Sequence, residues 1–332
     1  MSEPILKVRD LRLDIPVPAG TLHAVRGIDF DVAPGETLCI VGESGSGKSL
    51  TSLAIMGLLS PGIRRQAAEV SFDGIDLQKA SRKQMRGLRG NRLAMIFQEP
   101  MTSLNPAYTI GDQLSEALRL HRPVSKAEAR ARAAELLRMV GITAPDSRLG
   151  QFPHQLSGGL RQRVMIAMAL MCEPDLLIAD EPTTALDVTI QAQILRLLVD
   201  LKKKLGMALI LITHDLGVVG RVADKVAVMY AGELVETGPV DQIFRSPAHP
   251  YTRGLLDCIP VPGRITRGQR LGTIPGIVPS LIGRQTGCIF RDRCSEAVSA
   301  CAGEIPLREL ASSHRFSCVH PLGRHADKEI PA

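Results

Sequence analysis

A single loop near the start of the chain most restricts what it can fold into. The loop, Gly42-Glu-Ser-Gly-Ser-Gly-Lys-Ser49, lies between an apolar strand-like segment, residues 37–41, and an apolar helix-like segment, residues 50–59. In such a loop the glycines let backbone N–H groups wrap phosphates, Lys48 reaches the β- and γ-phosphates, and Ser49 ligates Mg²⁺ at a helix N-terminus. A plain glycine-rich turn is the alternative, but residue frequencies give this pattern by chance in roughly one such chain in a hundred. The loop therefore predicts an α/β fold that binds nucleotide phosphates.

Strand-like and helix-like segments alternate along most of the chain. Residues 4–42 alternate apolar and polar side chains, which is typical of half-buried strands, and residues 109–171 have helical spacing. The later segments are expected, in order, as strand 176–179, helix 190–205, strand 207–213 and strand 225–230. This alternation predicts a mainly parallel sheet with helices on both faces and ligands at the carboxyl ends of its strands.

Two acids end the strand predicted at residues 176–179. The apolar run delivers Asp180 toward a Mg²⁺ ion, and Glu181, one residue on, can polarise a water for in-line attack on a γ-phosphate. An apolar strand that ends in acids is common by itself. Together with the phosphate-binding loop it indicates nucleotide hydrolysis.

Composition excludes several classes of protein. With 45% hydrophobic and 22% charged residues, the chain is expected to be globular rather than disordered. No apolar run approaches the roughly 20 residues that span a bilayer, and the first residues lack a secretion signal, so we expect a cytoplasmic protein. A net charge of +6 suits nucleic acid, anionic lipid or nucleotide phosphate, but 3% aromatic residues and no Trp argue against a base-stacking platform for nucleic acid.

Further motifs carry a family resemblance. The sequence Leu156-Ser-Gly-Gly-Leu-Arg-Gln-Arg163, between the phosphate-binding loop and the acidic strand, resembles the signature motif of the ABC ATPases. Gln98 is similar to the Q-loop glutamine of that family, residues 185–187 to its D-loop, and His214, after a predicted strand, to its switch histidine. The resemblance implies a P-loop NTPase of ABC type: a mainly parallel sheet with an antiparallel N-terminal β subdomain and an inserted helical subdomain at about residues 100–172.

The resemblance also implies a mechanism in which two ATPase chains close head to tail on ATP. Glu181 would be the catalytic base, His214 the γ-phosphate sensor and Lys48 a catalytic cation. The residues expected to bind nucleotide are Gly42, Ser44, Gly45, Gly47, Lys48, Ser49, Leu50, Gln98, Asp180 and Asp187, of which Ser49, Gln98 and Asp180 would ligate Mg²⁺. Ser157, Gly158 and Gly159 would complete the site of the partner chain.

One position departs from the family. ABC ATPases usually stack an aromatic ring on adenine from a loop before the phosphate-binding loop, and residues 12–24 contain no aromatic residue. Ile15 or His23 would have to substitute. The loss of such stacking is expected to cost roughly 1–3 kcal/mol, by analogy with base–aromatic contacts.

Three segments, residues 98–106, 249–253 and 274–294, resemble the ATP-binding subunits of dipeptide/oligopeptide (peptide/nickel) importers. The resemblance implies a peripheral protein at the cytoplasmic face of the inner membrane, bound to two permease subunits and to a homologous second ATPase subunit as a heterodimer. An extracytoplasmic peptide-binding protein would complete the system, and nucleic acid is not expected as a partner.

Peptides are the expected cargo; nickel or glutathione-like cargo and a soluble ABC ATPase are the alternatives. Residues 42–156 leave no room for the long coiled coil of a DNA-acting ABC ATPase, and one phosphate-binding loop argues against a translation-type protein.

Four of the seven cysteines, Cys288, Cys294, Cys301 and Cys318, gather near the end of the chain. Four thiolates can hold a [4Fe–4S] cluster or complete the tetrahedral shell of Zn²⁺. Some members of the resembled subfamily carry a [4Fe–4S] cluster on a similar cysteine set, so the cluster is preferred, with zinc or unligated thiols as alternatives. We expect an ATPase domain at residues 1–258 and, after a proline- and glycine-rich connector, a C-terminal extension at 259–332 whose cysteines do not touch nucleotide chemistry.

Overall fold

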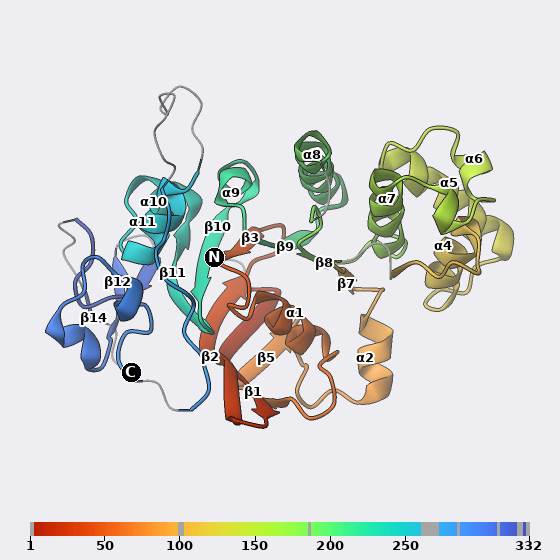
Figure 1. The fold of residues 1–332 in the computed structure, drawn as a ribbon. Coiled ribbons are helices and arrows are strands. Elements are labelled where there is room, and N and C mark those ends of the chain that lie inside the picture. Colours follow the sequence, from red (N-terminus) through yellow and green to blue (C-terminus); the bar gives the residue numbers. More distant parts are fainter. Residues whose placement is uncertain are drawn as a thin grey trace. The chain divides into compact units, whose positions relative to one another are not determined.

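The protein divides into two compact units, and Figure 1 shows its elements. The structure is a computed structural model that describes residues 3–98, 103–184, 187–259, 272–283, 286–310, 313–323 and 328–329. Unit 1 comprises residues 1–5, 32–36 and 75–212, and unit 2 comprises residues 6–31, 37–74 and 213–332.

Three parallel strands form the sheet of unit 1: β7 (Leu93–Ile96), β8 (Leu176–Asp180) and β9 (Ala208–Thr213). All their residues are buried, and nearly all are apolar, as expected of parallel strands that are covered on both faces. The same unit contains α2 (Arg82–Leu88), α8 (Val188–Leu205) and the short strand β6 (Ile75–Asp76). The strands predicted at residues 176–179 and 207–213 and the helix predicted at residues 190–205 are therefore confirmed at nearly the predicted residues. The strand predicted at residues 225–230 is confirmed as β10 (Lys225–Tyr230) in unit 2. Within the described part of the chain, no helix is both long and apolar enough to cross a membrane.

A group of helices lies between β7 and β8 in the sequence. It comprises α4 (Ile110–Arg119), α5 (Lys126–Met139), α6 (Pro145–Arg148), the 3₁₀ turn η1 (Pro153–Gln155) and α7 (Gly158–Ala169). Thr109 and Ser125 start α4 and α5, because their hydroxyls accept backbone N–H groups of the first turn. Helices α4, α5 and α7 pack against one another (Figure 1). The helical segment predicted at residues 109–171 is confirmed.

Antiparallel strands form the N-terminal part of unit 2. β1 (Leu6–Val17) pairs with β4 (Arg64–Gln66) and β5 (Glu69–Phe72), and β2 (Gly20–Val32) is a further neighbour of β1. In β1 the fully buried side chains are Leu6 and Val8, then Leu11 and Leu13, so the alternation shifts by one residue. Asp10 lies at this shift with a φ of 45°. A left-handed residue absorbs the extra position and keeps both pairs on the buried face.

A second sheet in unit 2 joins the strand before the phosphate-binding loop to the end of the chain. Its order is β3 (Thr37–Val41), β10 (Lys225–Tyr230), β11 (Glu233–Pro239), β13 (His314–Ser317), β12 (Leu307–Leu310) and β14 (Lys328–Glu329). β3 and β10 are parallel, and the later neighbours are antiparallel. Residues of the predicted extension thus continue the sheet that carries the loop. The domain boundary at residue 259 stays a prediction.

The helices of unit 2 are α1 (Lys48–Met56), α9 (Leu216–Val222), α10 (Val240–Arg245) and α11 (Pro250–Asp257), with 3₁₀ turns η2 (Arg291–Arg293) and η3 (Ser299–Ala302). α1 ends earlier than the predicted residue 59, because Gly57 adopts a left-handed φ of 62° and its N–H caps the helix. Of the predicted connector, residues 260–271 and 284–285 lie outside the described residues. In the described segment 272–283, Ile282 makes an isolated bridge to Leu22.

Candidate nucleotide site

The phosphate-binding loop connects β3 to α1 in unit 2. Close backbone contacts require two of its glycines: a Cβ on Gly42 would lie 2.0 Å from the carbonyl oxygen of Met229, and a Cβ on Gly47 would lie 2.6 Å from that of Ala24. Gly47 has a φ of 103° and is the N-cap of α1. The loop backbone and the first N–H groups of α1 therefore fit a phosphate cradle.

Lys48 is buried within this loop. Its Nζ donates to the carbonyl oxygens of Gly42 and Glu43, both at 2.8 Å, and to Ser46 Oγ at 3.4 Å. The ammonium group is thus held over the loop, where phosphate oxygens would be further acceptors. Of the other predicted loop residues, Ser44 and Gly45 are exposed, and Ser49 and Leu50 are half-buried.

In unit 1, two side chains hold the carboxylate of Glu181. Gln98 Nε2 donates to Glu181 Oε2 at 3.1 Å, and Thr184 Oγ1 donates to the same oxygen at 2.8 Å. Glu181 has a φ of 44°, in the left-handed region that residues with a Cβ rarely adopt. Such strain persists only where the surroundings fix it, and it clusters at functional sites. The structure therefore brings the predicted base and the predicted Q-loop glutamine together, and adds Thr184, which the sequence analysis missed.

Asp180 and Asp187 lie on either side of the segment that contains Glu181. Asp180 is the last residue of β8 and is 4% exposed. Asp187 is the exposed N-cap of α8, and its side chain makes no capping hydrogen bond. Residues 185–186 of the predicted D-loop lie outside the described residues, as do residues 99–102 of the segment predicted to be typical of peptide importers.

The signature segment forms the start of α7. Ser157 is the N-cap of this helix, with φ −66° and ψ 163°, yet its side chain makes no capping hydrogen bond. Ser157 and Gly158 are exposed, and Gly159 is half-buried. The hydroxyl and the first N–H groups of α7 therefore face solvent at an end where a helix attracts anions.

The predicted nucleotide residues are divided between the two units. The phosphate-binding loop with Lys48 belongs to unit 2, as does His214, which follows β9 and is exposed. Gln98, Asp180, Glu181, Asp187 and the signature residues belong to unit 1. The roles assigned to these residues stay predictions.

The two candidates for the adenine contact lie on neighbouring strands. Ile15 on β1 and His23 on β2 are half-buried. His23 Nδ1 and Asp14 Oδ1 form a hydrogen bond of 2.6 Å, which fixes the orientation of the imidazole ring. Of the two, His23 has the planar ring that can stack on a base, and this contact also stays a prediction.

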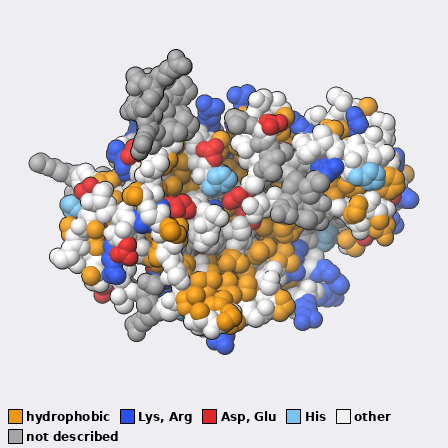
Figure 2. Space-filling model, in the orientation of Figure 1, with side chains coloured by type: hydrophobic (Ala, Val, Ile, Leu, Met, Phe, Trp, Pro, Cys, Tyr) orange, Lys and Arg blue, Asp and Glu red, His pale blue; other side chains and the backbone are white. Residues whose placement is uncertain are grey.

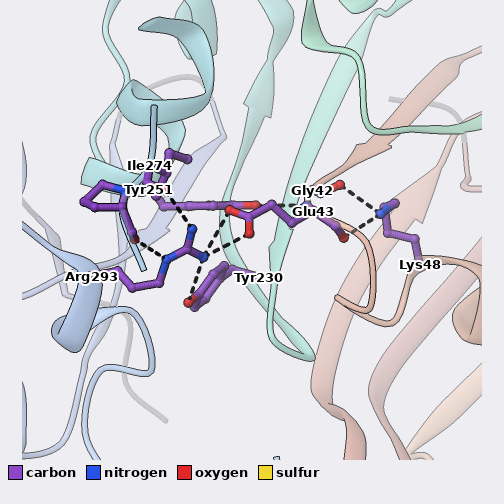
Figure 3. A network of polar contacts seen from close by, with 8 residues as sticks. Gly42, Glu43, Lys48, Tyr230, Tyr251, Ile274 and Arg293 are labelled. Atoms are coloured by element: carbon purple, nitrogen blue, oxygen red, sulfur yellow. Dashed lines mark hydrogen bonds and ion pairs between the residues drawn. The ribbon is translucent and has the colours of Figure 1, made fainter. Parts of the chain in front are cut away.

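A polar network that the sequence analysis missed meets the phosphate-binding loop at Glu43 (Figure 3). Arg293 Nη1 lies 3.1 Å and 3.0 Å from the two carboxylate oxygens of Glu43, and the hydroxyl of Tyr251 accepts the N–H of Glu43 at 3.0 Å. Arg293 lies on η2 in the predicted extension, and Tyr251 lies on α11. Both residues belong to segments that resemble peptide importers, but no spacing in the sequence pairs either of them with residue 43.

The four cysteines of the extension lie close enough to influence one another. Cys301 and Cys318 are buried, and Cys288 and Cys294 are partly buried. Burial raises the pKa of the Cys288 and Cys294 thiols and raises that of Cys318 to about 11, and the neighbouring cysteines add a smaller rise. Among the residues that the structure describes, however, no group of three or more His, Cys, Asp or Glu side chains is placed to hold a metal ion. The predicted metal site is therefore not confirmed.

Unit 1 also carries a groove along α4, with a volume of about 910 Å³. Its lining includes Asn105, Tyr108, Glu116 and Leu120. Tyr108 is 57% exposed and Leu120 is 72% exposed, and both line the same groove. Figure 2 shows hydrophobic side chains among basic ones on the surface of this helical group.

Two family models match the chain. Residues 25–184 match the model described as ABC transporter, and residues 235–301 match the model described as oligopeptide/dipeptide transporter, C-terminal region. The second match includes Arg293 and three of the four clustered cysteines.

Curated relatives match along nearly the whole chain. A Brucella melitensis protein named as a peptide import ATP-binding protein is 52% identical over 328 residues, which cover 96% of this chain and 97% of the relative. The dipeptide transport ATP-binding protein DppD of Escherichia coli is 51% identical over 319 residues, with 96% of this chain and 97% of the relative covered.

Solved structures match a large part of the chain. A dimeric ATP-binding cassette in a post-hydrolysis state with ADP and Pi has a TM-score of 0.64 at 28% identity, and the match covers 71% of this chain and 98% of that chain. The protein CbiO1 of Clostridium perfringens, part of the ABC transporter complex CbiONQ, has a TM-score of 0.61 at 31% identity, and the match covers 73% of this chain and 91% of that chain.

Proposed function

The chain belongs to the peptide-import family of ABC transporter ATP-binding subunits, and we propose that it binds and hydrolyses ATP to power the import of di- and oligopeptides. The observation that carries this proposal is its identity of about half to peptide and dipeptide import subunits over 96% of its length. The match of residues 235–301 to the oligopeptide/dipeptide transporter C-terminal region further supports peptides as the cargo. Nickel or glutathione-like cargo is the alternative, since other subunits of such importers choose the cargo.

The phosphate-binding loop would hold the triphosphate. Gly42 and Gly47 let the loop pack closely against the backbone of Met229 and Ala24, and Lys48 would add a positive charge at the β- and γ-phosphates. Ser49, Gln98 and Asp180 would hold Mg²⁺, which prefers such oxygen donors and, when bound, neutralises phosphate charge.

Glu181 would accept the proton of the attacking water. Its orientation is held by the hydrogen bonds from Gln98 and Thr184. His214 would sense the γ-phosphate. Ser157, Gly158 and Gly159, at the exposed start of α7, would complete the site of a second ATPase chain, which we propose to be a distinct homologue.

The proposed partners are two permease subunits, and an extracytoplasmic peptide-binding protein would complete the system. The groove along α4, with its exposed Tyr108 and Leu120, is the surface proposed for a permease. The chain would then lie peripherally at the cytoplasmic face of the inner membrane. A net charge of +6 is compatible with a position near anionic headgroups.

Replacement of Glu181 by Gln tests the ATPase mechanism. The change preserves size but removes the base, so we expect ATP affinity within about threefold of wild type and turnover reduced about 10²–10⁴-fold. Isothermal titration with ATP and phosphate release at saturating ATP measure the two quantities. Glu135→Gln is the control, because Glu135 is an exposed partner of Arg132 on α5. A wild-type chain that does not bind ATP would contradict the proposed function, whereas turnover reduced less than about threefold would contradict the role of Glu181 alone.

The set of four cysteines within residues 288–318 supports a further proposal, that Cys288, Cys294, Cys301 and Cys318 hold a [4Fe–4S] cluster, with zinc as the alternative. Protein purified without oxygen is expected to be brown, and Cys→Ser at any of the four positions is expected to remove the visible absorbance. Cys172→Ser in unit 1 is the control. Colourless protein with one equivalent of zinc would favour zinc, and colourless metal-free protein would contradict both.

A further inference from the structure

The guanidinium group of Arg293 is buried, and each of its three nitrogens has an acceptor. The side chain is 6% exposed, and an arginine is costly to bury unless its N–H groups are paired. Nε donates to Pro275 O at 2.8 Å and Nη2 to Ile274 O at 3.2 Å. Nη1 donates to both carboxylate oxygens of Glu43 and to the Tyr230 hydroxyl at 3.3 Å (Figure 3). This set holds the charged group in one place.

Aromatic rings surround this ion pair. The rings of Tyr230 and Tyr251 are 4.6 Å apart, and those of Tyr230 and Phe290 are 5.2 Å apart. The Arg293 guanidinium carbon lies 5.6 Å from the centre of the Tyr230 ring. The rings pack at the Arg293 end of the pair, whose side chain is 6% exposed, whereas the Glu43 side chain is 29% exposed. A pair that is partly removed from water is attracted more strongly than one in bulk water. The pair is therefore unlike the exposed salt bridges that contribute little.

Glu43 connects this pair to the predicted phosphate site. Its carboxylate binds Arg293, its N–H donates to the Tyr251 hydroxyl at 3.0 Å, and its carbonyl oxygen accepts Lys48 Nζ at 2.8 Å. All three polar groups of one loop residue are thus held, and the third holds the lysine. Arg293 also neutralises a carboxylate that would otherwise repel phosphate oxygens.

We propose that Arg293 is a positioning residue for the phosphate-binding loop: by holding and neutralising Glu43, it keeps the loop and Lys48 in the conformation that accepts phosphate. The identity of the ligand as a nucleoside triphosphate rests on the proposed function. The C-terminal extension, which contains every one of the clustered cysteines, thereby takes part in nucleotide binding without contributing a nucleotide-binding motif.

ATP binding by a set of full-length variants tests the proposal. Arg293→Ala leaves the Glu43 carboxylate unpaired, so we expect the Kd and the KM for ATP to rise at least about fivefold while kcat at saturating ATP changes less. Glu43→Gln in the Arg293→Ala background removes the repulsive charge and is expected to restore part of the lost affinity. Arg293→Lys keeps the charge and is expected to fall between wild type and Arg293→Ala. The control is Arg291→Ala, on the same 3₁₀ turn, because Arg291 is 40% exposed and pairs with Asp292.

Hydrogen exchange of nucleotide-free protein gives a readout that does not depend on ATP. Amides of residues 42–48 are expected to exchange at least about fivefold faster in Arg293→Ala than in wild type or Arg291→Ala. If wild type does not bind ATP but this acceleration is seen, the proposed function fails and the positioning role stands. A folded Arg293→Ala protein with wild-type exchange in residues 42–48 would overturn the positioning role. Independent, multiplicative effects of the Arg293 and Glu43 substitutions on ATP affinity would overturn it as well.

Discussion

The carboxylate of Glu181 is held in a way that suits a base that must meet a water molecule in one orientation. Gln98 and Thr184 both donate to the same oxygen, and the N–H of Glu181 donates to Ile212 O at 3.0 Å. These bonds accompany a left-handed φ, a conformation that costs of order 1–3 kcal/mol in a residue with a Cβ. The side chain and the backbone are therefore fixed together, and Thr184 takes part in the fixing.

Thr184→Val tests this role at equal side-chain volume. The change removes one of the two hydrogen bonds to the carboxylate, so we expect turnover to fall about 3–30-fold while the Kd for ATP stays within about twofold. Thr184→Ser retains the hydroxyl and is expected to keep turnover within about threefold of wild type. Steady-state phosphate release and ATP titration provide the comparison. Equal turnover in the Val variant and in wild type would show that Gln98 alone is sufficient to hold Glu181.

At the scale of elements, strand β11 contacts both the start of α11 and strand β13 through one side chain, Glu236. Glu236 on β11 is 1% exposed. Its carboxylate accepts the N–H groups of Ala248 at 2.6 Å and of His249 at 2.9 Å, and it lies 2.7 Å from His314 Nε2 on β13. A buried carboxylate is stable only with such partners. His249 is itself the N-cap of α11, and its Nδ1 accepts the N–H of Tyr251 at 3.0 Å, so the segment that resembles peptide importers, residues 249–253, has a structural reason for its first residue.

Burial of His249 gives this group of elements a pH dependence. Burial lowers the pKa of His249 to about 4 from an ordinary 6.5, so the unfolded chain binds more protons than the folded one between these pH values. The contribution to stability is complete above about pH 6.5 and is lost as pH falls toward 4. His249→Asn keeps an acceptor at the N-cap and removes the titration. Urea unfolding at pH 7.5 and at pH 5.0 gives the free energy of unfolding that each protein loses between these pH values. We expect this loss to be about 2 kcal/mol smaller in the His249→Asn variant than in wild type. An identical loss in both proteins would assign the pH dependence to other groups.

For the whole molecule, the division into two units separates the predicted nucleotide residues into two sets. The phosphate-binding loop, Arg293 and His214 belong to unit 2, and Glu181 with the signature residues belongs to unit 1. The signature residues Ser157 and Gly158 are exposed. In the proposed head-to-tail arrangement, one chain alone would lack the signature residues of a partner at its nucleotide.

Isolated chain is therefore expected to be monomeric or weakly dimeric and to have low ATPase activity. Light scattering at micromolar concentration and phosphate release measure both properties, first for the chain alone and then after co-expression with a candidate homologous ATPase and candidate permease subunits. Activity is expected to rise at least about tenfold in the complex, because the partner completes the site. A tight and fully active homodimer without membrane subunits would contradict the distinct partner.

The chemistry of the predicted site could be derived from the sequence because the residues of each motif lie close together along the chain. Gly42 to Ser49, the acids after β8 and the signature segment each need only local spacing, and the alternating and helical patterns predicted most strands and helices. The apolar shift in β1 is visible in the sequence, but its cause is not, because a left-handed Asp10 is a backbone property.

Only the tertiary structure decided which distant side chains meet. Arg293 and Glu43 are 250 positions apart, and His314 and Glu236 are 78 positions apart, so no local pattern couples them. The His314–Glu236 pair forms because β11 and β13 are neighbours in one sheet of unit 2. The Arg293–Glu43 pair forms because Arg293 on η2 contacts Tyr230 at the end of β10, which is the neighbour of β3. Local spacing determines what a segment can bind, whereas packing determines which residues from elsewhere hold that segment in place.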